Sequence, residues 1–104
     1  MMSVETAFDR IGSALRHMGY SLTGDQEPAT PQADRTEVYA SPSMAVRVRW
    51  IEKARMLVLQ VKVGAEWVEF ARRSFGPKGL EENAVEALVR SVHAEVAQTS
   101  TDAG

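Results

Sequence analysis

The chain contains no cysteine, only two histidines and only seven aromatic residues among its 104 residues. Without cysteine it cannot form a disulfide, a thiol nucleophile or a thiolate metal site. It also lacks an apolar run near the roughly 20 residues that span a bilayer, and its first residues lack the basic start and apolar stretch of a signal peptide. We therefore expect a cytoplasmic protein with no membrane partner.

Charge is nearly balanced in total but unevenly distributed along the chain. The formal net charge is −2. Residues 44–78 hold eight basic and three acidic side chains, whereas the segments before and after them hold more acidic than basic ones. The balanced total argues against a protein that coats nucleic acid, while the basic middle leaves local binding of nucleic acid open.

Apolar residues at spacings of three and four predict a helix near each end of the chain. The first has Ser3 as its expected N-cap and Gly19 just past its end. The second is expected to end near Gln98, so residues 1–98 form one domain and residues 99–104 a frayed polar tail. The two apolar stripes consist of Val4, Phe8, Ile11, Leu15 and Met18, and of Val85, Leu88, Val89, Val92 and Val96.

Alternating apolar residues between the helices predict antiparallel strands over 44–51, 56–63 and 66–73. A two-residue turn at Gly64-Ala65 and a four-residue loop after residue 51 give registers that agree with each other. In that register one face collects Val46, Val48, Trp50, Leu57, Leu59, Val61, Val63, Val68 and Phe70.

The segment before these strands is harder to interpret. Residues 23–35 contain two prolines and no apolar residue larger than alanine, which predicts a mobile loop. A shorter strand is expected around residues 37–40, but the sequence does not fix which of its faces points inward.

Together these elements predict an α+β fold, a two-layer sandwich with the order helix, antiparallel meander of three or four strands, helix. Both helices are expected on one face of the sheet, because one face carries the apolar residues. The order of elements resembles that of the double-stranded-RNA-binding domain.

The other face of the predicted sheet mixes apolar and basic side chains. Trp and Arg often anchor interfaces, and a contiguous exposed apolar patch is unusual on a monomer. Ordinary cross-strand pairs, Lys62 with Trp67 and Arg47 with Glu69, are the alternative interpretation. The predicted binding residues are Trp67, Met56, Ile51, Val58, Arg47, Arg49, Lys62 and Arg73.

Signals for catalysis are weak. The segment 60–62, Gln-Val-Lys, resembles the acid-x-lysine strand of PD-(D/E)xK nucleases, whose core has the order α-β-β-β-α and which cleave with a metal ion. Here glutamine replaces the acid, and strand 44–51 supplies no carboxylate for a cation. His17 and His93 are interpreted as surface residues, and loop 76–79 lacks the spacing of a phosphate-binding loop.

The favoured hypothesis is a small, bacterial-type, non-enzymatic interaction module without cofactor, metal or small-molecule substrate. It would pair with itself as a homo-oligomer, or with a partner protein, through the mixed apolar and basic face. The first alternative is a single-stranded nucleic-acid binder in which the basic residues meet phosphates and Trp67 stacks on bases. The second is a degenerate or metal-dependent nuclease-like domain.

Overall fold

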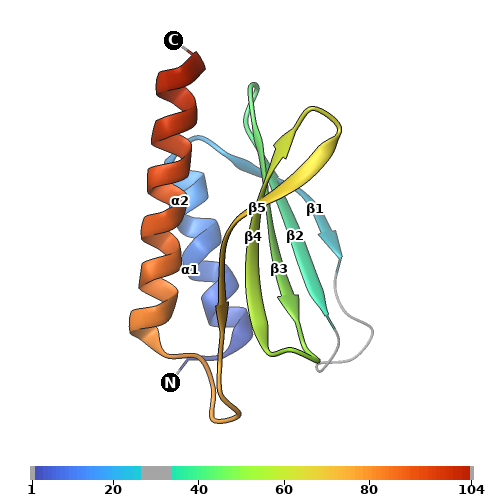
Figure 1. Cartoon of the computed structure of the whole chain (residues 1–104), viewed down its shortest axis with the longest axis vertical. Coiled ribbons are helices and arrows are strands. Elements are labelled where there is room, and N and C mark those ends of the chain that lie inside the picture. Colours follow the sequence, from blue (N-terminus) through green and yellow to red (C-terminus); the bar gives the residue numbers. More distant parts are fainter. Residues whose placement is uncertain (1, 27–33, 104) are drawn as a thin grey trace.

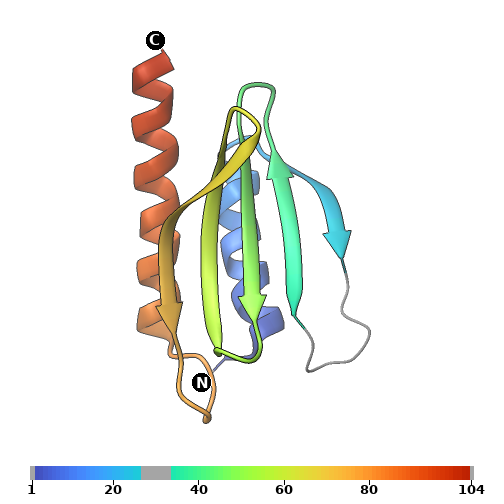
Figure 2. The ribbon, with the colours of Figure 1, turned by 45° about the vertical axis from the view of Figure 1, so that its right-hand side comes forward.

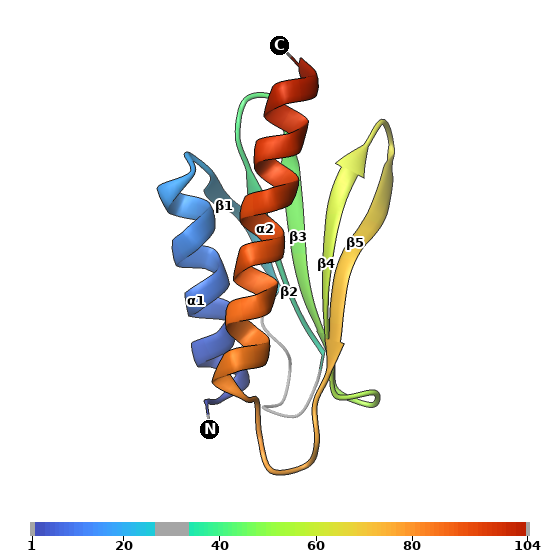
Figure 3. The same ribbon diagram turned by 60° about the vertical axis from the view of Figure 1, so that its left-hand side comes forward.

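A computed structural model describes residues 2–26 and 34–103 and shows an α+β fold with two helices and a five-stranded sheet. The strands pair antiparallel in the order β1-β2-β3-β4-β5, so that each strand lies beside its neighbours in sequence (Figure 2). Both helices lie on one side of the sheet (Figures 1 and 3). The elements are α1 (Val4–His17), β1 (Ser21–Gln26), β2 (Arg35–Ala40), β3 (Ala45–Ile51), β4 (Met56–Val63), β5 (Glu66–Ser74) and α2 (Glu82–Ala103).

Helix α1 has the ends that its sequence predicts. The Ser3 hydroxyl accepts a hydrogen bond from the backbone N–H of Thr6, which is the bond of an N-cap residue. Past the helix, Gly19 has a φ of +92°, a left-handed conformation that favours glycine. The N–H of Tyr20 then donates to the carbonyl of Leu15 at 3.0 Å, which completes a Schellman ending.

The core lies between the helices and the facing side of the sheet, where apolar stripes from both layers meet. An ion pair between Arg10 and Glu86 links the outer surfaces of the two helices. The largest fully buried side chains are Trp50, Phe8, Ile11, Leu15, Leu57, Leu59, Leu80, Val46, Val48, Val85 and Val92.

Within the described residues, neither helix combines the length and the apolar character needed to cross a membrane.

Strand β1 corrects part of the predicted loop over residues 23–35. Residues 23–26 belong to β1, residue 35 begins β2, and residues 27–33 lie outside the described residues. The polar sequence of β1 has no apolar alternation, so its pairing rests on backbone hydrogen bonds to β2 and includes a bulge between Leu22 and Gly24. The sheet therefore has one strand more than the upper end of the prediction.

The structure also settles which face of β2 points inward. Glu37 and Tyr39 face the helices, and Glu37 is buried with only 6% of its surface exposed. Its carboxylate accepts hydrogen bonds from the Tyr39 hydroxyl at 3.0 Å and from Arg35 at 2.8 Å. A buried carboxylate is tolerated here because both of its oxygens have donors.

The pH dependence of stability should report on this buried network. Burial and then the neighbouring Glu37 carboxylate raise the pKa of Tyr39 to about 12, against an ordinary value near 10. Below pH 10 the hydroxyl keeps its proton in both states. Between pH 10 and 12 the unfolded chain loses it first, so the free energy of unfolding should fall, by on the order of 2 kcal/mol.

Urea unfolding of the wild type and of Tyr39→Phe across this pH range measures the effect. In the phenylalanine variant, the free energy of unfolding should fall only by the part that other titrating groups cause. Tyr20 is one of these, because burial raises its pKa as well. Identical pH profiles for the two proteins would contradict the assignment to Tyr39.

The register of the central hairpin confirms the prediction, and that of the last hairpin confirms it only in part. Strands β3 and β4 pair Val48 with Leu59, as expected. Strands β4 and β5 pair Val61 with Val68 as predicted, but Leu59 then lies opposite Ala71 rather than Phe70. A β-bulge at Phe70 adds one residue to β5, so every later residue of this strand is shifted by one relative to the prediction.

Two predicted core residues near the tip of the last hairpin are exposed instead. Val63 and Val68 expose 59% and 45% of their surface, although both lie on the helix-facing side by register. Figures 1 and 3 show the tip of the β4–β5 hairpin well separated from α2. Regular alternation places a side chain on a face, but burial also requires a second layer above it.

Helix α2 is longer than predicted. It continues to Ala103, whereas the sequence analysis placed its end near Gln98 and expected a frayed tail over 99–104. The polar residues after 98 carry no apolar stripe, which is why hydrophobic periodicity does not detect this part of the helix.

Candidate interaction surface

The side of the sheet away from the helices, here called the open face, has no helix in front of it (Figure 2). Its members follow from the register, because directly opposed residues on neighbouring strands share a face and residues alternate along each strand. On strands β2 to β5 its main side chains are Thr36, Val38, Arg47, Arg49, Ile51, Met56, Val58, Gln60, Lys62, Trp67, Glu69 and Arg72.

Arg47 and Trp67 form the best-defined cluster of the open face. The Arg47 guanidinium lies over the Trp67 ring, 4.6 Å from its centroid, and its Nε donates to Oε1 of Gln60 at 2.7 Å. The sequence analysis considered Lys62 as the cation beside Trp67, and Lys62 is indeed the residue directly opposite it. The long Arg47 side chain reaches from β3 across β4 to the Trp67 ring on β5, and this reach decides which cation covers the ring.

The apolar side chains of the open face are less exposed than expected. Val58 has only 4% of its surface exposed, and Ile51, Met56 and Trp67 are half-buried. No helix lies over Val58, and its direct neighbours across the strands are two arginines, so the stems of long side chains must cover it. Val58 therefore lies beneath the long side chains of the open face in the free chain.

The bulge at Phe70 exchanges two arginines between the faces of the sheet. Arg73 was predicted on the open face, but it lies opposite the core residue Leu57 and therefore on the helix-facing side. Arg72 takes the place on the open face, opposite Val58, and forms an ion pair with Glu69 at 3.3 Å. Sequence reasoning missed Arg72 because no local sequence pattern marks the bulge at Phe70.

The open face carries a clear excess of positive charge. Arg47, Arg49, Lys62 and Arg72 oppose only Glu69 among its members on β2 to β5, which gives a net charge of +3. Since the whole chain has a net charge of −2, the remainder carries −5. The open face and the rest of the chain thus carry net charges of opposite sign.

Arg49 stands out within this group. It is half-buried on β3, the middle strand, between Thr36 of β2 and Val58 of β4. Its side chain makes no hydrogen bond, ion pair or ring contact with any residue in the described part of the chain. Burial and then the charge of Arg49 lower the pKa of Arg47, as expected for a half-buried guanidinium group with a second one two residues away on the same face of its strand.

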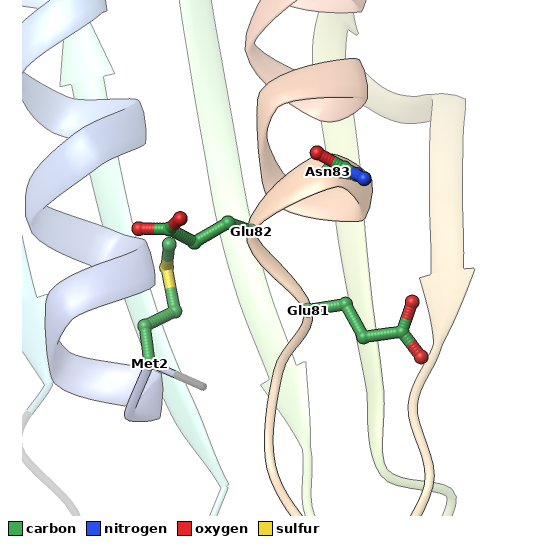
Figure 4. A pocket seen from close by; sticks show the side chains of 4 residues that line it. All are labelled: Met2, Glu81, Glu82 and Asn83. Atoms are coloured by element: carbon green, nitrogen blue, oxygen red, sulfur yellow. The ribbon is translucent and has the colours of Figure 1, made fainter.

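Two hollows lie outside the centre of the open face and are weaker candidates for a binding site. One, of about 530 Å³, lies where α1 and α2 begin and is lined by Met2, Glu81, Glu82 and Asn83. Figure 4 shows the carboxylates of Glu81 and Glu82 directed to opposite sides, so they do not converge on one point. The other, of about 330 Å³, lies at the β2–β3 turn and includes Lys62.

Residues 60–62, which resemble a nuclease strand, lie in positively charged surroundings that disfavour a cation. Gln60 stands where that resemblance places an acid, and it accepts the hydrogen bond from Arg47. Guanidinium groups within this cluster would repel a metal ion rather than hold it. Across residues 2–26 and 34–103, no three histidine, aspartate or glutamate side chains are grouped closely enough to bind a metal.

No family model matches the chain, and no curated protein or solved structure is similar enough to it to count as a match.

Proposed function

We propose that the chain is a small, non-enzymatic interaction module that binds another protein surface, a partner protein or a second copy, through the open face of its sheet. The observation that carries this proposal is that half-buried apolar side chains lie on a face that no helix covers, with Ile51 and Met56 at one end, Trp67 toward the other end and arginines between them. Tryptophan and arginine are the residue types that most often dominate binding energy at interfaces. A cytoplasmic location is part of the same proposal.

A paired substitution on each face of the sheet tests this proposal. Trp67→Ser with Met56→Ser removes apolar surface from the open face, whereas Val63→Ser with Val68→Ser removes it from the helix-facing side of the hairpin. We expect the first pair to weaken binding at least tenfold, because a few large anchor side chains carry most of the energy of an interface. The second pair should change binding less than twofold.

The measurement is solution mass by sedimentation over a range of concentrations, together with capture of partner proteins by each immobilised variant. Circular dichroism verifies that both variants keep the helices and the sheet. The reverse pattern, in which the valine pair abolishes binding, would place the interface at the hairpin tip. A chain that stays monomeric and retains nothing would contradict the proposal.

Single-stranded nucleic acid is the second candidate, favoured by the net charge of +3 on the open face. Arg49 and Lys62 would meet phosphates, and the side of the Trp67 ring not covered by Arg47 would stack on a base. Such binding falls steeply with salt, because each neutralised phosphate releases counterions.

A further inference from the structure

The charge of the open face discriminates between the possible protein partners. Two copies stacked face to face would set Arg47, Arg49, Lys62 and Arg72 of one chain against the same side chains of the other. Like charges brought together in an interface weaken it and act against that pairing. The face is complementary to an anionic surface and not to itself.

The arginines of the open face differ in how far their hydrogen-bonding capacity is already used. Arg47 is held by Gln60 and Trp67, and Arg72 is paired with Glu69. Arg49, at the centre, has no such contact with any described residue. Its guanidinium offers five donors in a planar fork that matches a carboxylate.

The surroundings of Arg49 favour a strong contact there. The buried side chain of Val58 lies beside it, and Arg47 on the same strand adds a second positive charge about 7 Å away along the strand. A carboxylate bound at this point would also relieve the repulsion between the two guanidinium groups. A partner residue that is shielded from water at the centre of an interface contributes more than one at its rim.

We propose that the open face binds an acidic segment of a partner protein and that Arg49 is the anchor for one of its carboxylates. This inference rests on the proposed function and narrows it, because it names the chemistry of the partner and rejects a second copy stacked on the same face. Apolar side chains of the segment would lie on Ile51, Met56 and Trp67, around the charged centre.

Nucleic acid fits the same charge less well. Proteins that bind single strands without strong sequence preference combine a basic groove with several aromatic side chains on which successive bases stack. The open face on strands β2 to β5 offers one aromatic side chain, Trp67, and Arg47 already covers one side of its ring.

The test uses the full ¹⁵N-labelled chain and a defined probe, a capped helical peptide of roughly 20 residues with glutamates at i and i+4 and leucines on the same face. Glutamates at that spacing lie about 5–6 Å apart, close to the separation of Arg47 and Arg49. We expect amide shifts to concentrate on β3, β4 and β5, which carry Arg49, Met56 and Trp67. A peptide with glutamine in place of glutamate should bind roughly tenfold more weakly.

Arg49→Glu and Arg73→Glu form the decisive comparison. Both make the same charge change, and neither side chain has a hydrogen bond, ion pair or ring contact with the residues that the structure describes, but the two lie on opposite faces of the sheet. Arg49→Glu should weaken binding of the acidic peptide roughly tenfold or more, and Arg73→Glu should change it less than twofold. The dispersion of the amide spectrum shows that each variant is folded.

Several results would overturn the inference. Equal loss in both variants would mean that general charge, and not Arg49, binds the peptide. Binding of oligo-dT that depends on Arg49, without binding of the peptide, would assign the face to nucleic acid. Self-association that is lost on changing Trp67 and unaffected by Arg49→Glu would reject the acidic partner while leaving the proposed function intact. Absence of any peptide binding also rejects it, and the Trp67 and Met56 experiment then decides the proposed function by itself.

Discussion

Replacing Trp50 with alanine should lower the free energy of unfolding by about 3 to 5 kcal/mol, which is a large part of the stability of a domain of this size. Trp50 has only 2% of its surface exposed and lies on the helix-facing side of β3. Its ring contacts the guanidinium of Arg55 and the ring of Phe75, with centroid distances of 5.5 and 6.3 Å, and its Nε1 donates to Glu52. Truncation removes all of these contacts and leaves a cavity.

The matched control is Val63→Ala, at a position that the sequence pattern places in the same core. Because 59% of Val63 is exposed, this change should cost less than about 0.5 kcal/mol. Urea unfolding followed by circular dichroism measures both values. Equal losses for the two variants would mean that the hairpin tip packs under the helices after all.

A second large effect is expected at Gly12, where a glycine in the middle of a helix has a packing role. A Cβ atom at this position would overlap the Tyr39 hydroxyl and lie 2.9 Å from its Cζ atom. The Tyr39 ring cannot move away easily, because it is buried and its hydroxyl donates to Glu37. In an exposed helix alanine is better than glycine by about 1 kcal/mol, but here Gly12→Ala should destabilise the protein by about 3 kcal/mol.

A double-mutant cycle with Tyr39→Phe identifies the cause. Removing the hydroxyl should restore part of the loss from Gly12→Ala, with a coupling energy of about 1 kcal/mol or more. Ser13→Ala, on the exposed side of the same helix, serves as a control and should stay within about 0.5 kcal/mol of the wild type. A stabilising Gly12→Ala would show that α1 and β2 do not approach each other as described.

The sequence predicted those parts of the fold in which two independent signals agree. For α1, the apolar stripe, the cap residue Ser3 and the terminal Gly19 all indicate the same boundaries. For the β3–β4 hairpin, the alternation of side chains and the length of the connecting loop give the same register. The observed pairs, such as Val48 with Leu59, follow directly.

Other parts depend on interactions that no local pattern encodes. Strand β1 has the sequence Ser-Leu-Thr-Gly-Asp-Gln and is defined by hydrogen bonds to β2, a strand that lies beyond an intervening segment. The inward orientation of Glu37 depends on donors from Arg35 and Tyr39, which compensate for burying a carboxylate.

The candidate surface shows the same division. Alternation placed Arg47, Arg49 and Trp67 on the open face, and the pairing of the strands agrees. Alternation failed for Arg73, because the bulge reverses the order of faces after Phe70. It also could not show that Val58 is buried, since that depends on the long side chains of neighbouring strands.

The bulge in β5 has a consequence for how the chain can change in length. Phe70 is the one residue of the Glu66–Ser74 strand that has no counterpart across the ladder to β4. A chain without it would therefore still present Arg72 to the open face and Ala71 to the helices. Deletion of Trp67 would instead remove the bulge, because Phe70 would then pair with β4. Val68 would move to the open face, and the Glu69 side chain would turn toward the core.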